Sequence, residues 1–107
     1  MTSFEDRERA EEAKFAFDAE MQFRIQARRN RLLGEWAARR MALSPAEAEA
    51  YAKAVVQADF EEAGDEDVIR KLLGDLISAG VDIDEAEVRG ALDAKQIEAR
   101  RALLGEV

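Results

Sequence analysis

The stretch VIRKLLGDLI, residues 68–77, carries the strongest structural signal in the chain. Its apolar residues form the pairs Val68-Ile69, Leu72-Leu73 and Leu76-Ile77, which places a broad apolar stripe on one face of a helix. Gly80 supplies a stop signal after this stretch. We expect the internal Gly74 to mark close packing, since glycine otherwise weakens a helix. The pattern predicts a core helix.

A start signal follows Gly80. Asp84 is a good helix cap, and Glu87 three positions later completes a capping box. Ile83 and Val88 flank this cap and form a hydrophobic staple. The next helix is therefore predicted to begin after Asp84. Its apolar stripe consists of Val88, Leu92, Ala99 and Leu103.

Another start signal lies upstream at residues 44–47, with a serine cap, a proline at the first helical position and a glutamate that closes a capping box. The helix is predicted to run to about Glu62. Gly64 then ends it, and Asp65 is expected to cap the following helix. Its apolar positions are Tyr51, Ala52, Val55, Val56, Ala58 and Phe60.

The first helix is predicted to be long, from about residue 15 to residue 41, with only Gly34 to interrupt it. Phe4, Phe15 and Phe23 fall outside the sector of its core stripe. One core cannot cover all these faces, and an unused aromatic face suits a partner groove. The core stripe itself consists of Phe17, Met21, Ile25, Leu32 and Trp36.

Residues 1–14 are dense in charge, with Phe4 as their single large apolar side chain. We expect them to be frayed or disordered alone and to become ordered on a partner, because a short isolated helix is marginal in water. The fold class is therefore all-α. A mobile N-terminal segment, residues 1–18, precedes a four-helix bundle, residues 19–107, whose first helix is long.

Composition excludes several classes of function. The 107 residues make one domain and include neither Cys nor His, so disulfides, thiolate metal sites and a histidine base are excluded. No apolar run approaches the about 18 residues of a membrane span. The N-terminus also lacks the features of a signal peptide. We expect a cytoplasmic protein without direct membrane insertion.

The charge distribution points away from nucleic acid as a partner. The net charge is −8, yet residues 21–43 hold six Arg and one Glu. Arg28, Arg29 and Arg31 form the densest basic run, and Arg39-Arg40 follow. Either these residues balance acids on neighbouring helices, or they dock an acidic partner or a nucleotide phosphate. No glycine-rich phosphate loop supports the nucleotide alternative.

Catalytic and metal-binding roles find little support. The acidic cluster lacks the spacing of a calcium loop, so a solvated helix junction is expected in its place. The serines have no histidine base, and no cleft for paired carboxylates is expected in so small a bundle. We therefore predict no enzyme activity, no cofactor and no metal. The cluster consists of Glu61, Glu62, Asp65, Glu66 and Asp67.

Four parts of the sequence carry a family resemblance. They are FEDRERAEEAKFAFD at residues 4–18, ARRNRLLGEWAA at residues 27–38, EAEAYA at residues 47–52 and ADFEEAGDEDV at residues 58–68. They are similar to the zeta subunit family of α-proteobacterial F1FO-ATP synthase inhibitors. The likeness spans most of the chain and weakens after about Arg70.

The resemblance implies a four-helix bundle that is monomeric when free and peripheral to the membrane through the ATP synthase. Its N-terminal segment would inhibit ATP hydrolysis by entering an interface between the α and β subunits of F1, with γ as a further candidate contact. Relatives often carry histidine at the position of Phe17, so a histidine-based pH switch is not expected here. The implied contact residues are Phe4, Arg7, Glu8, Arg9, Lys14 and Phe15.

A helical adaptor or assembly factor is the alternative function. It would bind an acidic surface through Arg28, Arg29 and Arg31, and it would not need the N-terminal segment.

Overall fold

The computed structural model describes the backbone of residues 3–61 and 64–105, and the side chains of residues 18–61 and 64–105. The described residues form four helices and contain no strand. The predicted all-α four-helix bundle is confirmed. The helices are α1 (Ser3–Arg40), α2 (Pro45–Glu61), α3 (Asp65–Ser78) and α4 (Glu85–Leu104).

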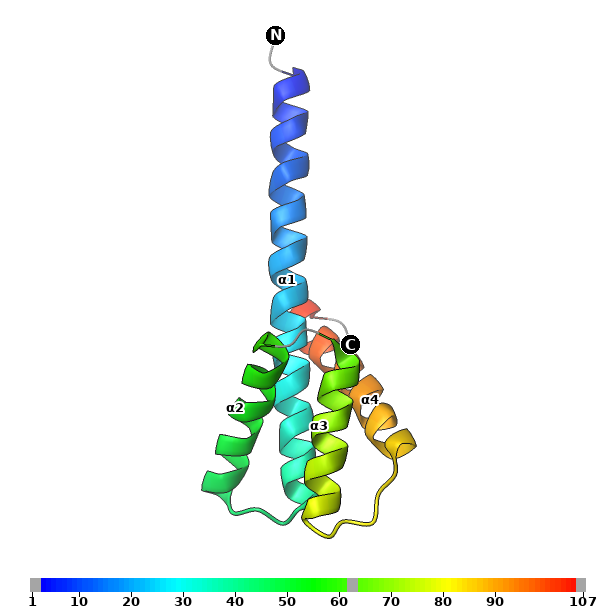
Figure 1. The fold of residues 1–107 in the computed structure, drawn as a ribbon. Helices are drawn as coiled ribbons and strands as arrows, with labels where there is room; N and C mark the ends of the chain where they lie inside the picture. The colour runs from blue at the N-terminus through cyan, green and yellow to red at the C-terminus, as the bar shows by residue number, and fades with distance from the viewer. Residues whose placement is uncertain (1–2, 62–63, 106–107) are drawn as a thin grey trace.

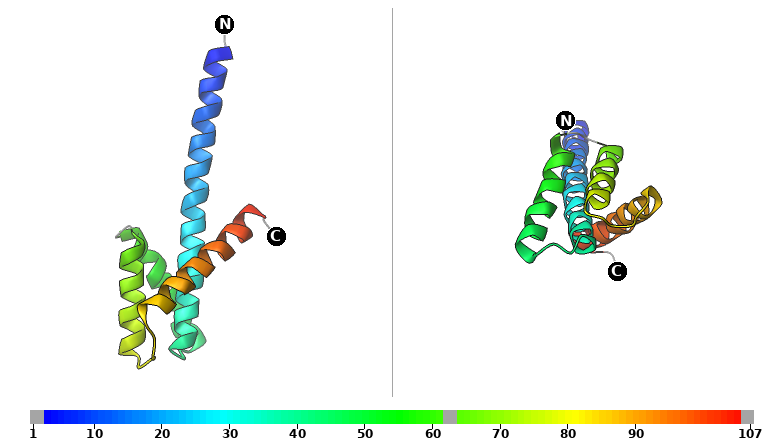
Figure 2. Two further views of the ribbon diagram at one scale, coloured as in Figure 1. Left: turned by 90° about the vertical axis from the view of Figure 1, so that its right-hand side faces the viewer. Right: turned by 60° about the horizontal axis from the view of Figure 1, so that its bottom comes forward.

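Helix α1 is the central element, and the other helices pack around its C-terminal half (Figure 1). Helix α2 runs antiparallel along one side of α1, whereas α4 crosses α1 obliquely (Figure 2). Helix α3 packs against both α2 and α4. The N-terminal half of α1 projects beyond this bundle, and the long axis of the molecule measures 67 Å against 28 and 26 Å for the other two axes.

The core forms where all four helices meet. Helix α3 contributes most to it, as the stripe in residues 68–77 predicts, although Ile77 at the end of that stripe is 56% exposed. Burial of each large aliphatic side chain contributes about 1.5–3 kcal/mol before entropy is considered. The buried cluster consists of Leu33, Ala37, Val55, Val68, Ile69, Leu72, Leu76, Val88 and Leu92.

The buried face of α1 differs from the predicted stripe. Leu33 is fully buried, whereas Leu32 and Trp36 are only partly buried. The reason is that α1 packs between α2 and α4, so its buried surface is wider than a single stripe and is centred elsewhere. This surface includes two polar residues that the hydrophobic pattern could not identify, Arg29 and Asn30.

The predicted caps of α2 and α4 are confirmed. Ser44 Oγ accepts a hydrogen bond from the backbone N–H of Glu47 at 3.2 Å, and the Glu47 carboxylate accepts one from the Ser44 N–H at 3.0 Å. Asp84 accepts from the N–H of Glu87 at 2.9 Å, which confirms the cap, whereas the Glu87 carboxylate pairs with Arg40 on α1 at 3.5 Å and makes no return bond of the predicted capping box among the described contacts. The stop at Gly80 is also confirmed, since Gly80 adopts φ 84° and donates its N–H to Ile77.

The predicted cap of α3 is wrong. Asp65 is the first helical residue, and Gly64, with φ 139°, precedes it without a side-chain capping bond. The Asp65 carboxylate instead accepts a hydrogen bond from Arg29 on α1, at 2.9 Å from Nη1. A tertiary contact thus replaces the local one.

The start of α1 also differs from the sequence pattern. The helix begins at Ser3, well before residue 15, and it is continuous through residue 18. The alanine, glutamate, arginine and lysine in this region all favour helix. The division of the chain into residues 1–18 and 19–107 stays a prediction.

Candidate partner-binding site

Helix α1 leaves the bundle close to Ile25, which is the first buried residue along its described side chains. Asp18, Ala19 and Glu20 are exposed, and Met21 is only partly buried. Further towards the N-terminus the backbone of α1 has no other helix beside it (Figures 1 and 2). A single helix therefore extends from the bundle into the space around it.

The residues expected to contact a partner lie on this projecting part of α1. Their backbone is helical. Their side chains lie outside the described residues, so their contacts stay a prediction. These residues are Phe4, Arg7, Glu8, Arg9, Lys14 and Phe15.

Two exposed aromatic side chains lie where α1 emerges. Phe23 on α1 and Phe60 on α2 are 59% and 70% exposed, and their rings pack edge to face with centroids 6.3 Å apart. Exposure of Phe23 agrees with its predicted place away from the core stripe. Phe60, one of the apolar positions noted in the second predicted helix, lies outside the core and packs against Phe23.

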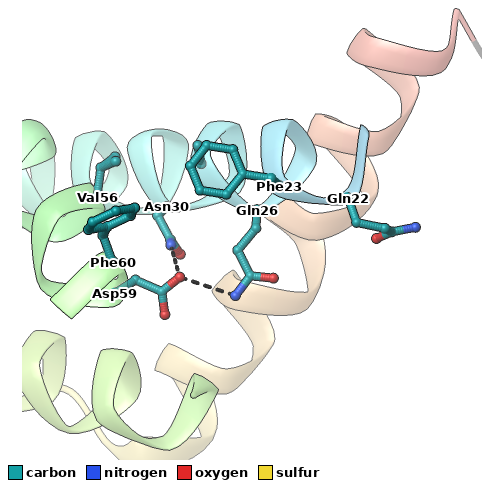
Figure 3. A pocket seen from close by; sticks show the side chains of 8 residues that line it. Gln22, Phe23, Gln26, Asn30, Val56, Asp59 and Phe60 are labelled. Carbon is teal, nitrogen blue, oxygen red and sulfur yellow. Dashed lines mark hydrogen bonds between the residues drawn. The ribbon is translucent and has the colours of Figure 1, made fainter. Parts of the chain in front are cut away.

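A pocket of about 330 Å³ lies beneath these rings (Figure 3). On its polar side, one carboxylate oxygen of Asp59 accepts hydrogen bonds from Asn30 Nδ2 at 2.7 Å and Gln26 Nε2 at 3.1 Å. The other oxygen, Oδ1, is buried and has no donor among the described residues. The lining residues are Gln22, Phe23, Gln26, Ala27, Asn30, Val56, Asp59 and Phe60.

The side chain of Arg29 lies inside the bundle. It is 2% exposed, and its guanidinium donates to Asn30 Oδ1 at 2.9 and 3.1 Å as well as to Asp65. A longer contact of 3.4 Å reaches Gln96 on α4. One side chain of α1 therefore holds the beginning of α3 and the middle of α4 in place, which agrees with the charge-balancing interpretation of Arg29.

The other two arginines of the basic run are on the surface. Arg31 pairs with Glu35, at 3.2 Å, and with Glu49 on α2. Arg28 is exposed and has no ion pair with any described residue. Docking of a partner through Arg28 and Arg31 stays a prediction.

The acidic cluster forms an ion-paired helix junction. Glu66 accepts two hydrogen bonds from Arg89 on α4, at 2.9 and 2.7 Å, and this contact lowers the pKa of the Glu66 carboxyl. Asp67 pairs with Arg70 at 3.0 Å. Glu62 of the same cluster lies outside the described residues. Within the described ranges, no group of three or more acidic side chains could hold a metal ion.

No helix in the described parts of the chain is both long enough and apolar enough to cross a bilayer.

Comparison with known proteins supports the assignment of the chain. No curated protein matches it. A protein solved by solution NMR is 49% identical, aligns over 81% of this chain and 99% of its own, and superposes with a TM-score of 0.69. The family model of the ATPase inhibitor subunit zeta matches residues 1–102. The projecting first helix and the four-helix bundle are therefore those of a chain that belongs to the ATPase inhibitor subunit zeta family.

Proposed function

We propose that this chain is a non-catalytic regulatory subunit that inhibits ATP hydrolysis by the F1 sector of the ATP synthase. In this proposal residues 4–18, the inhibitory segment, enter an interface between an α and a β subunit as a helix. There they prevent rotation in the hydrolytic direction. The contact side chains are Phe4, Arg7, Glu8, Arg9, Lys14 and Phe15.

The projection of α1 is the observation that carries this proposal. The helix is 38 residues long, which corresponds to about 57 Å. Among the side chains that the structure describes, from residue 18 onward, Ile25 is the first buried residue of α1, and the backbone of α1 continues for 22 residues before it. An isolated helix has little stability of its own in water, whereas a partner groove can cover several of its faces at once. Phe4 and Phe15 give this segment the apolar anchors that such binding requires.

A regulatory role agrees with the composition. The chain has no His and no Cys, and Ser44 is engaged in a helix cap. The family to which the chain belongs is named for inhibition of an ATPase.

ATP hydrolysis by purified cognate F1 tests the proposal. The full-length chain should inhibit, and the chain with residues 1–18 deleted should not. Phe4→Ala combined with Phe15→Ala should weaken inhibition at an unchanged melting temperature. Ile77→Ala is the matched control, because Ile77 is an exposed apolar residue on α3, outside the inhibitory segment.

Equal inhibition by the full-length and the truncated chain would overturn the insertion mechanism. Absence of inhibition by either chain would overturn the function itself.

A further inference from the structure

We propose that a basic groove between α1 and α2 binds an acidic amphipathic helix of the F1 ATPase as a second anchor. This inference rests on the proposed function, because the groove lies next to the inhibitory segment on the same helix. The groove has a volume of about 550 Å³. It is lined by Phe23, Arg24, Ala27, Arg28, Arg31, Lys53, Val56, Gln57 and Leu103.

The groove has polar rims and an apolar lining, which fit an amphipathic helix. The rim on α1 consists of Arg24, Arg28 and Arg31, spaced four and three residues apart along one face. On α2, Lys53 and Gln57 are again four residues apart. A helix lying between two such rims would present apolar side chains inward and polar ones to each side, as in other helix-in-groove complexes. The apolar lining comes from Phe23, Ala27, Val56 and Leu103.

The charge of the groove selects an acidic occupant. The whole chain carries a net charge of −8, yet four cations gather here. Arg28 has no ion pair within the described part of the chain, and the Lys53 side chain is 70% exposed with only a long contact of 3.7 Å to Glu49. These cations are therefore available to carboxylates of a partner.

The remaining two cations are paired at the surface. Arg24 contacts Glu20 at 2.6 Å, and Arg31 contacts Glu35 and Glu49. Surface ion pairs of this kind contribute little to stability. Carboxylates of a partner can replace them at little cost.

The exposed aromatic pair supplies the apolar anchor of the interface. Phe23 lines both the basic groove and the pocket next to it, and its ring contacts Phe60. Exposed aromatic side chains surrounded by cations are typical of binding surfaces, where aromatic residues and arginine carry much of the energy.

The position of the groove explains how it assists the inhibitory segment. Arg24 follows residue 18 by about 9 Å along the helix axis. A subunit that holds residues 4–18 is therefore kept close to the groove by one continuous helix. A second contact on the same body raises the effective concentration of the first.

Inhibition titrations of the full chain test this inference. Arg28→Glu combined with Lys53→Glu should raise the concentration for half-maximal inhibition by about tenfold, while saturating protein still inhibits fully. Arg39→Glu combined with Arg70→Glu is the matched control, because it makes the same change in net charge at exposed positions outside the groove. This control should leave the titration unchanged.

A photo-crosslinker at Gln57 provides a readout that does not depend on inhibition. We expect it to attach to an acidic helix of F1, and a crosslinker at Arg70 to give no such product. Inhibition without a Gln57 cross-link, or with an unchanged titration of the groove variant, would overturn the second anchor and leave the proposed function standing. A Gln57 cross-link to F1 without inhibition would support the groove and overturn the function. A cross-link only to a second copy of this chain, or no cross-link and no inhibition, would overturn the inference.

Discussion

Gly34 on α1 lies so close to Ala52 on α2 that a Cβ added at Gly34 would be 2.8 Å from the Ala52 Cα. The same added atom would be 3.2 Å from a methyl carbon of Val55. The first of these is a backbone atom, which cannot move without moving the helix. The contact therefore determines how closely α1 and α2 pack, and glycine is required here for space, not for backbone conformation.

Gly34→Ala is expected to destabilise the protein by about 1–3 kcal/mol, because the clash with α2 outweighs the better helix propensity of alanine. The matched control is Gly90→Ala in α4, where an added Cβ meets nothing within 4 Å. That control should stabilise by up to about 1 kcal/mol. Urea denaturation followed by circular dichroism measures both changes. Two variants of equal stability would contradict the packing argument.

The close approach at Gly34 could not be found from the sequence. The sequence pattern predicted close packing at Gly74, and this prediction is wrong, because Gly74 is exposed and an added Cβ there meets nothing within 4 Å. Periodicity identifies which face of a helix is apolar. It does not identify where two backbones meet, because that depends on the crossing of two helices.

The end of α1 provides a second prediction. Ala42 adopts φ 58°, and the hydrogen bonds from Ala42 N–H to Arg39 and from Leu43 N–H to Ala38 close a Schellman motif. This left-handed conformation is costly for alanine but not for glycine. Ala42→Gly should therefore stabilise the protein by about 0.5–1 kcal/mol in thermal or urea unfolding. Ala50→Gly, at an exposed position inside α2, should destabilise it by a similar amount.

The buried guanidinium of Arg29 provides a third prediction. Arg29→Ala removes the contacts to Asp65 and Asn30 and leaves a cavity, so a loss of about 2–4 kcal/mol is expected. Arg28→Ala, at the preceding and exposed position, should change stability by no more than about 0.5 kcal/mol. Equilibrium unfolding in urea compares the two. Similar losses for both would show that Arg29 contributes only as part of a general basic surface.

Local and tertiary features differ in how well the sequence predicts them. The caps at Ser44 and Asp84 depend on residues three positions apart, so the local sequence is enough to predict them. The burial of Arg29 depends on Asp65 and Gln96, which are 36 and 67 positions away. The basic groove likewise joins α1 to α2 and α4, and the sequence predicted only the cations on α1.

The Ser44–Glu47 capping box predicts a pH dependence of stability. The backbone N–H of Ser44 lowers the pKa of the Glu47 carboxyl in the folded state, followed by the smaller contribution of the Ser44 side chain. A lowered folded pKa means that the unfolded chain takes up the proton more readily. The stabilisation is therefore present at neutral pH and is lost as the pH falls through the folded pKa of Glu47.

Glu47→Gln should reduce this loss of stability in acid. Unfolding midpoints in urea at neutral pH and at about pH 3 measure the effect. Asp82→Asn is the control, because it removes an exposed carboxylate that has no interaction with another described residue. An equal change in pH dependence for both variants would contradict the role of the capping box.

The division of the chain at residue 18 can be tested by stability alone. Deletion of residues 1–18 should reduce the helical signal in circular dichroism but leave the urea midpoint unchanged, because no described side chain before Ile25 is buried. Deletion of residues 1–26 should lower stability by about 2–4 kcal/mol, since it also removes Ile25 and the hydrogen bond from Gln26 to Asp59. Fluorescence of Trp36, the one tryptophan, reports on the bundle in both proteins. If the shorter deletion also lowered the midpoint, the N-terminal segment would be packed on the bundle in the free protein. Release of that segment would then have to precede any insertion into F1.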